Sequence, residues 1–154
     1  MRRLDRTERE IVRLLQDDAR RSNKELAAAT GIAPSTCSER VKRLEAEGVL
    51  LGSHAIVDPR ALGIGLRAMV AIRLSRHAAS EVDRFRDHAL AMPEVIGWSH
   101  VTGANDFLVQ VVVRDAEHLR QLAVSGFTSM PEVAHIETAL VFEHVDKPAL
   151  PDLL

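Results

Sequence analysis

Residues Ser22–Gly48, with the sequence SNKELAAATGIAPSTCSERVKRLEAEG, decide the fold of the N-terminal part of the chain. The stretch predicts two short helices joined by a tight turn. Ser22 and Glu25 have the spacing of a capping box, in which each side chain accepts a hydrogen bond from the other residue's amide. Gly31 ends the first helix, because glycine adopts the left-handed conformation without a Cβ penalty. Pro34 begins the second helix, where its missing N–H would have no intrahelical partner.

The second helix has one apolar face and one polar face. Cys37, Val41 and Leu44 are spaced by four and three residues and form an apolar stripe, so the other side chains point outward. The major groove of DNA admits one helix, arginine donates bidentately to guanine, and serine or threonine contacts base edges or phosphates. Glu39 could instead pair with Arg43 at i+4 on the helix surface. The residues expected at or near bases are Ser35, Thr36, Ser38, Glu39, Arg40 and Arg43, with Lys42 and Lys24 expected on phosphates.

Another helix precedes this pair. Asp5 and Glu8 repeat the capping-box spacing, and Ile11, Leu14 and Leu15 supply an apolar face. A helix-turn-helix unit needs such a third helix for its core. Two helices joined by a glycine turn also occur in protein-binding modules and in enzymes, so this pattern alone leaves those classes open.

The composition limits the remaining possibilities. The chain has 154 residues, of which 46% are hydrophobic and 27% charged, and this suits one globular domain or two small ones. A single cysteine excludes an intrachain disulfide, and no histidine spacing is typical of zinc, so we expect no metal and no cofactor. No apolar run is long enough to span a bilayer, and the start MRRLDRTERE is too charged for a secretory signal. We expect a soluble, cytoplasmic protein without a membrane partner.

Charge is distributed unevenly along the chain. Residues 1–52 carry a small excess of basic over acidic side chains, whereas residues 53–154 carry an acidic excess. Affinity for DNA depends on where the cations lie more than on their number. A surface that binds a polyanion is therefore expected at the N-terminus.

The pattern changes after Gly48. Residues 49–57 predict a short extended segment that Asp58 and Pro59 end, and we place an interdomain linker at residues 51–65. The chain then alternates in the order strand, helix, strand, strand, helix, strand, which implies an α+β ferredoxin-like sandwich with two helices on one face of an antiparallel sheet. The predicted strands are Leu66–Leu74, Val95–Thr102, Asp106–Arg114 and Val133–His144, and the predicted helices are Ala79–Ala91 and Asp115–Met130.

The second face of that sheet has no covering element in the sequence. Met69, Ala71 and Val112 fall on this face, and a single chain would expose them. We therefore expect two copies to associate sheet to sheet. The alternative is that these small apolar groups simply contact solvent.

The turn between the second and third strands is a candidate site for a small ligand. A free amino acid needs N–H donors for its carboxylate and an oxygen acceptor for its ammonium group. A glycine-containing turn offers the donors, and an aspartate offers the acceptor. The candidate residues are Thr102, Gly103, Ala104, Asn105 and Asp106. A plain hairpin turn uses the same residue types.

Several segments, taken together, resemble the Lrp/AsnC (feast/famine) transcriptional regulators. They are the Leu4-Asp5 start, GIAPSTCSERVKRLEAEGVL, VDPRALG in the linker, VTGANDFLVQV, and the closing MPEVAHIETALVFEHV. Each motif is loose, but their order and spacing are specific, and the resemblance covers nearly the entire chain.

The resemblance implies a winged or simple helix-turn-helix DNA-binding domain, placed at residues 1–50, and an amino-acid-sensing, oligomerising domain of RAM or ACT type, placed at residues 66–145. Residues 146–154 are expected to form a C-terminal tail. The implied partners are double-stranded promoter DNA, an amino-acid-type effector, and further copies of the chain as a homodimer that often associates into an octamer. The implied effector pocket lies between dimers, at the turn and the facing last strand, which adds Ser99, His100, His135, Glu137 and Thr138.

Two positions depart from the family pattern. Ala33 stands where members usually have a serine that caps the recognition helix, and loss of such a cap costs about 1 kcal/mol of helix stability. If Ser35 takes over as the cap, the start of the helix and the register of base contacts shift. Asn105 stands where an aromatic residue is common before Asp106 and Phe107, so the identity of the ligand does not transfer.

Two other functions share parts of this pattern. Sirohaem decarboxylases resemble these regulators in both domains and are enzymes, but their recognition helix need not keep DNA-reading groups such as Arg40, Lys42 and Arg43. An architectural DNA-compacting protein would show neither an amino-acid response nor a sequence preference. We favour a non-enzymatic transcriptional regulator, whose dimer places two recognition helices about 34 Å apart in successive major grooves of a roughly palindromic operator.

Overall fold

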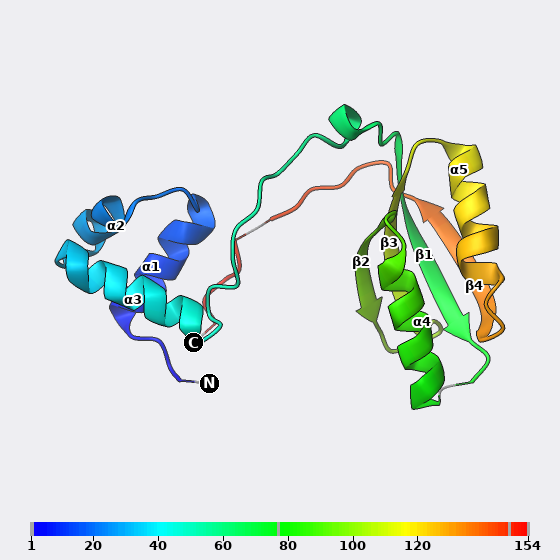
Figure 1. Cartoon of the computed structure of the whole chain (residues 1–154), viewed down its shortest axis with the longest axis horizontal. Helices are drawn as coiled ribbons and strands as arrows, with labels where there is room; N and C mark the ends of the chain where they lie inside the picture. Colours follow the sequence, from blue (N-terminus) through cyan, green and yellow to red (C-terminus); the bar gives the residue numbers. More distant parts are fainter. Residues whose placement is uncertain (1, 77, 148, 154) are drawn as a thin grey trace. The chain divides into compact units, whose positions relative to one another are not determined.

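A computed structural model of the chain describes residues 2–76, 78–147 and 149–153 (Figure 1). The contacts divide the chain into two compact units. One unit contains the residues up to Ile56 together with those from Val145 onward, and the other contains Val57–His144. The division after Ile56 falls inside the segment predicted as a linker, and each unit has its own hydrophobic core.

The N-terminal unit is built from three helices. They are α1 (Arg6–Asp17), α2 (Asn23–Thr30) and α3 (Pro34–Ala46). Both predicted capping boxes are formed, by Asp5 with Glu8 and by Ser22 with Glu25, and Gly31 ends α2 with φ 70°. The helices enclose a core of Ile11, Leu14, Leu26, Ala27, Cys37 and Leu44. Among the described residues of this unit no strand is formed; after Gly48, Val49 and Leu50 donate their N–H groups to the Leu44 carbonyl at the end of α3.

Helix α3 begins at Pro34, as the sequence predicts. Ala33 occupies the N-cap position with extended backbone and makes no side-chain capping bond, and Pro34 is the first helical residue. Ser35 therefore does not take over as the cap. The register of α3 is the one that Pro34 sets, and its N-terminus lacks one hydrogen bond that a serine cap would supply.

The C-terminal tail lies against α1 of the same unit. The backbone N–H of Leu150 donates to Gln16 Oε1 at 2.7 Å, and Asp152 Oδ2 lies 3.7 Å from Arg9 Nε. The tail expected at residues 146–154 thus has contacts within its own chain; its last residue, Leu154, lies outside the described residues. In the linker, the only regular element of the described residues is a short 3-10 helix, Pro59–Leu62, which Asp58 caps.

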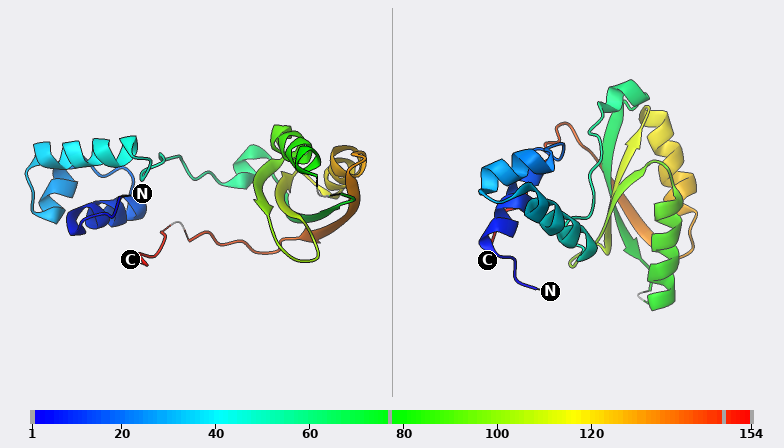
Figure 2. Two further views of the ribbon diagram at one scale, coloured as in Figure 1. Left: turned by 90° about the horizontal axis from the view of Figure 1, so that it is seen from below. Right: turned by 60° about the vertical axis from the view of Figure 1, so that its left-hand side comes forward.

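The second unit is a four-stranded antiparallel sheet with the strand order β2-β3-β1-β4. The strands are β1 (Leu66–Leu74), β2 (Val95–His100), β3 (Phe107–Val113) and β4 (Val133–Leu140). Helix α4 (Ala79–Ala91) and helix α5 (Ala116–Gln121), which continues as a π-helix over Leu122–Thr128, lie on one face of the sheet (Figure 2). This is the predicted ferredoxin-like order, which confirms the fold class.

Two strands end two or more residues earlier than the sequence predicts. β2 ends at His100 rather than Thr102, and β4 ends at Leu140 rather than His144. A strand extends only while its neighbour offers backbone groups to pair with, and Leu140 is opposite Ala68 near the start of β1. One further bond, from Val141 N–H to the Arg67 carbonyl at 2.9 Å, completes the contact.

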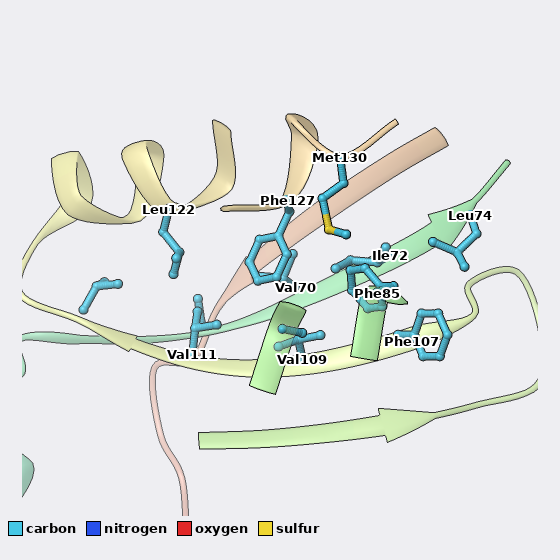
Figure 3. Close-up of a cluster of buried hydrophobic side chains, with 13 residues drawn as sticks. Val70, Ile72, Leu74, Phe85, Phe107, Val109, Val111, Leu122, Phe127 and Met130 are labelled. Atoms are coloured by element: carbon cyan, nitrogen blue, oxygen red, sulfur yellow. The ribbon is translucent and has the colours of Figure 1, made fainter. Parts of the chain in front are cut away.

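The core of this unit lies between the sheet and its two helices (Figure 3). Phe85 of α4 stacks on Phe107 of β3 with ring centroids 4.9 Å apart, and Phe127 approaches Phe85 at 6.4 Å. The inward residues of β1 and β3 alternate along their strands as the sequence predicts. They are Ala68, Val70, Ile72 and Leu74 on β1, and Phe107, Val109, Val111 and Val113 on β3.

The opposite face of the sheet is less exposed than predicted at one position. Met69 and Ala71 are partly exposed there, but Val112 is only 9% exposed. Val112 lines a hollow of about 220 Å³ together with Leu62 and Ile64 of the linker, and these neighbours shield it. The expectation that a single chain exposes Val112 is therefore wrong, because residues 62–64 return to the sheet.

Candidate DNA-binding helix and effector-binding turn

The predicted DNA-contacting residues lie mostly on the exposed surface of α3. Ser35, Thr36, Glu39 and Lys42 are exposed, and Ser38 is half-buried. Cys37 and Leu44 hold the opposite face of α3 in the core. Burial raises the pKa of the Cys37 thiol, so this thiol is a packing group rather than a nucleophile. Lys24, which is also exposed, lies on α2.

Both arginines that were predicted to contact bases have partners inside the N-terminal unit. Arg43 Nη2 donates to Glu8 Oε1 at 2.5 Å. Arg40 Nη1 donates to the carboxylate of Asp5 and lies 3.8 Å from Glu8 Oε1. Arg43 thus pairs with Glu8 instead of with Glu39. Arg43 is exposed as expected while it forms this pair, whereas Arg40 is half-buried, because the acidic N-terminus of α1 lies beside this part of α3.

Glu8 is the centre of this network, and it is fully buried. Both Nη atoms of Arg2 donate to its carboxylate at 2.8 Å, and Arg2 Nη2 also reaches Glu47 Oε2, next to the end of α3, at 3.0 Å. The hydrogen bond from Arg2 lowers the pKa of Glu8 to about 2, against the effect of burial. The carboxylate therefore stays charged and ties the first residues of the chain, α1 and α3 into one rigid unit.

In the second unit, Asp106 anchors the candidate effector turn to the end of β1. Its carboxylate accepts a hydrogen bond from Leu74 N–H at 2.8 Å, and its own N–H donates to the Ile72 carbonyl at 2.8 Å. Gly103 has φ 122°, a conformation that L side chains rarely adopt. Thr102, Gly103 and Ala104 are exposed, and Asn105 and Asp106 are half-buried. These two hydrogen bonds fix the Asp106 end of the turn to β1.

The other predicted effector residues do not converge in a single chain. The ring of His100 packs on that of Phe107, with centroids 4.8 Å apart, on the helix-covered side of the sheet. Because successive side chains of a strand point to opposite faces, Ser99 points to the other side. On β4, Thr138 is opposite Val70, whereas His135 and Glu137 are opposite Arg73 and Ala71. A pocket that uses all of these residues would require further copies of the chain.

One cavity involves residues that the sequence analysis did not select. It has a volume of about 260 Å³ and lies between the end of β1, the first half of α4 and the turn before β4. Its described lining residues are Ser75, Arg76, Glu81, Arg84, Pro131 and Glu132. The sequence contains no local signal for it, because a glutamate in a turn is usually solvated.

The described residues do not include a group of three or more metal-ligating side chains that could hold an ion. In the same residues, every helix is too short or too polar to span a bilayer.

The sequence matches two domain families that together cover most of the chain. Residues 4–50 match a winged helix-turn-helix DNA-binding domain, and residues 67–150 match the Lrp/AsnC ligand binding domain.

Two curated relatives and one solved structure agree with these matches. The transcriptional regulator AldR of Mycolicibacterium smegmatis is 40% identical over 92% of this chain and 83% of its own length. The transcriptional activator DecR of Escherichia coli is 32% identical over 92% and 93%. A transcriptional regulator of Neisseria meningitidis, solved in complex with L-Met, superimposes with a TM-score of 0.86, at 26% identity over 94% of each chain. The chain belongs to the Lrp/AsnC family of transcriptional regulators, with a helix-turn-helix domain followed by the family's ligand-binding domain.

Proposed function

We propose that the protein binds operator DNA in a sequence-specific manner through α3, and that an amino acid or related metabolite bound by the C-terminal unit controls this binding. The observation that carries the proposal is the fixed position of α3. Its core face is buried, and Arg43 ties it to the buried Glu8 of α1. A helix that is held rigidly, with hydroxyl and basic groups exposed, suits reading of the major groove.

The predicted DNA-contacting residues then have three kinds of role. Ser35, Thr36, Ser38 and Glu39 contact base edges, and Lys42 and Lys24 contact phosphates. Arg40 is a positioning residue, because its side chain is held by Asp5. Arg43, whose side chain is 48% exposed while it pairs with Glu8, positions the helix and still reaches the DNA surface.

The effector proposal rests on the ligand-binding domain and on the turn at Thr102–Asp106. The anchored Asp106 and the backbone of Gly103 supply an acceptor and N–H donors to a bound amino acid, with residues of β2 and β4 contributed by other copies of the chain. The L-Met complex of the Neisseria meningitidis regulator supports an amino acid as the class of effector. We further propose that the protein acts as a homo-oligomer in the cytoplasm and has no enzymatic activity.

The test is binding of the purified protein to its own upstream promoter fragment, compared with unrelated DNA of equal length. Binding is measured at two salt concentrations, with and without a mixture of amino acids. Preferential, salt-sensitive binding that amino acids alter is the expected result. Equal binding to both fragments at every condition would contradict sequence-specific autoregulation, and visible absorbance after incubation with sirohaem would favour the decarboxylase alternative.

A further inference from the structure

The C-terminal tail, described over residues 149–153, binds along one side of helix α1. The Leu150 N–H donates to Gln16 Oε1 at 2.7 Å, and Asp152 Oδ2 lies 3.7 Å from Arg9 Nε. Arg9 and Gln16 are separated by about two helical turns, so their side chains lie on the same face of α1. The tail therefore runs along this helix toward its N-terminal end.

The tail sequence favours an extended conformation before it docks. Pro151 has a fixed φ, and it restricts the preceding residue, Leu150, to extended backbone. A second proline stands at position 148 of the sequence. Prolines leave the free tail with less conformational entropy to lose, so a small number of polar contacts can hold it on α1.

The docked tail is a second connection between the two units. The residues from Val145 onward group with the N-terminal unit, whereas β4, which ends at Leu140, belongs to the other unit. Val141 is still bonded to β1, through its N–H and the Arg67 carbonyl. The chain thus passes from one unit to the other first through the linker and again after β4, and both passages end in contacts.

This second connection is the shorter of the two. An extended chain covers about 30 Å between Val141 and Leu150, the two residues whose N–H groups are bonded at its ends. The linker runs from Leu50, which packs on the N-terminal core, to Leu66 at the start of β1, and it can cover about 55 Å. The docked tail therefore limits the separation of the units more than the linker does.

We propose that the docked tail is a strap that restricts the motion of the helix-turn-helix unit and thereby prepares two such units for one operator. The inference deepens the proposed function and rests on it, because two α3 helices of an oligomer must enter major grooves about 34 Å apart. A unit on a shorter tether has fewer positions to lose when it binds the second half-site, so its effective concentration there is higher. Binding to a single half-site gains nothing from the strap.

The first measurement follows the separation of the two units in the full-length protein without DNA. Spin labels are attached through Arg20→Cys in the N-terminal unit and Asp87→Cys on α4, where both side chains are exposed. The native Cys37 is buried and stays unlabelled. Labelled chains are diluted with unlabelled protein, so that only distances within one chain are measured. Deletion of the chain from residue 149 onward should widen the distance distribution about twofold, as the two chain lengths imply.

Two further variants and a control separate docking from tether length. Gln16→Ala removes the acceptor of the Leu150 N–H and should widen the distribution as the deletion does. Insertion of about six Gly and Ser residues between His144 and Val145 keeps every docking residue but lengthens the connection, so it should also widen the distribution. Gln121→Ala removes the same type of side chain from α5, in the other unit, and should leave the distribution unchanged.

The second measurement compares binding to the promoter fragment with binding to a shortened fragment that keeps one half-site, both defined by footprinting. The deletion and the insertion should each weaken binding to the full fragment by about threefold to tenfold and leave binding to the single half-site unchanged. An equal loss on both fragments would overturn the strap, because it would mean that the tail only supports the fold of the N-terminal unit.

The distances decide the inference separately from the DNA-binding proposal. Unchanged distributions in Gln16→Ala and in the insertion variant overturn the strap, whatever the protein does with DNA. If the wild-type protein shows no preference for its promoter fragment, the proposed function fails, and the distances measured without DNA still decide whether the tail restrains the helix-turn-helix unit.

Discussion

Arg43 of α3 donates a hydrogen bond to Glu8 of α1 at 2.5 Å, across 35 residues of sequence. The Glu8 carboxylate also takes part in the capping box of α1, where it accepts a hydrogen bond from Asp5 N–H at 3.0 Å. It accepts two further hydrogen bonds from the Nη atoms of Arg2. One buried carboxylate thus completes the capping box of α1 and positions α3. The orientation of the candidate DNA-binding helix depends on it.

Replacing Glu8 with alanine should destabilise the N-terminal unit by about 2–3 kcal/mol, because the arginines lose a buried partner and the capping box loses the hydrogen bond from Asp5 N–H. The arginines are partly exposed and regain water, which limits the cost. Urea unfolding, followed by a probe specific to this unit, measures the effect. Glu10→Ala, on the exposed side of the same helix, removes a surface pair with Arg13 and should change stability by less than about 0.5 kcal/mol. Equal effects of the two changes would contradict the central role of Glu8.

The same carboxylate should make the stability of this unit depend on pH. The hydrogen bond from Arg2 lowers the pKa of Glu8 from the ordinary 4.5 to about 2 in the folded protein. A depressed folded-state pKa contributes stability that is present above the unfolded value and is lost as the pH falls through the folded value. Stability should therefore fall between about pH 5 and pH 2. In Glu8→Gln this contribution is absent, so its unfolding free energy should change less over that range; parallel curves for the two proteins would argue against the shift.

Ala33→Ser should stabilise α3 by about 1 kcal/mol, since the N-cap backbone is already extended and lacks a side-chain acceptor. The expected observation is a higher unfolding midpoint of the N-terminal unit. Ala78, at the N-cap of α4, also lacks a side-chain capping bond, and it lies in the other unit. Ala78→Ser is thus a control that should leave the N-terminal transition where it is. No gain from Ala33→Ser would mean that the cap geometry is different.

Gly65→Ala should destabilise the C-terminal unit by at least about 2 kcal/mol, because a Cβ there would lie 2.2 Å from the Arg114 carbonyl oxygen. That atom belongs to the backbone and cannot rotate away, and Gly65 N–H also donates to the Val113 carbonyl at 3.0 Å. Gly97→Ala is the matched control. Its Cβ would meet only the Gln110 side chain, at 3.3 Å, so chemical denaturation should detect a smaller loss. A tolerated Gly65→Ala would show that the two segments can separate.

Lys42→Ala should weaken DNA binding on operator and unrelated DNA to a similar extent. Loss of one phosphate contact should reduce the slope of log affinity against log salt by about 0.9. Thr36→Ala, by contrast, should lower affinity for the operator more than for unrelated DNA, because it removes a base-edge contact. Arg20, whose side chain is 93% exposed between α1 and α2, provides a control. If Arg20→Ala changes the salt slope as much as Lys42→Ala does, α3 is not the DNA-contacting surface.

Local chemistry in the sequence determined the helices of the N-terminal unit and the order of elements in the sheet. The Asp5 and Ser22 capping boxes, Gly31 and Pro34 act within a few residues, so their effects are readable without a structure. The alternation along β1 is equally local, because successive side chains point to opposite faces. These features predicted a helix-turn-helix unit followed by a ferredoxin-like unit.

Tertiary structure alone decided which charged groups meet. The partner of Arg43 could have been Glu39 at i+4, and nothing nearby in sequence favours Glu8. The same holds for Glu132, which the packing of β1, α4 and β4 buries against Arg84. Long-range electrostatic pairing depends on distances that only the folded chain sets, and the free energy of a charged side chain depends on the burial that those distances impose. Local residue patterns therefore determine the helices and strands of this protein, whereas only the fold decides which charges share a site.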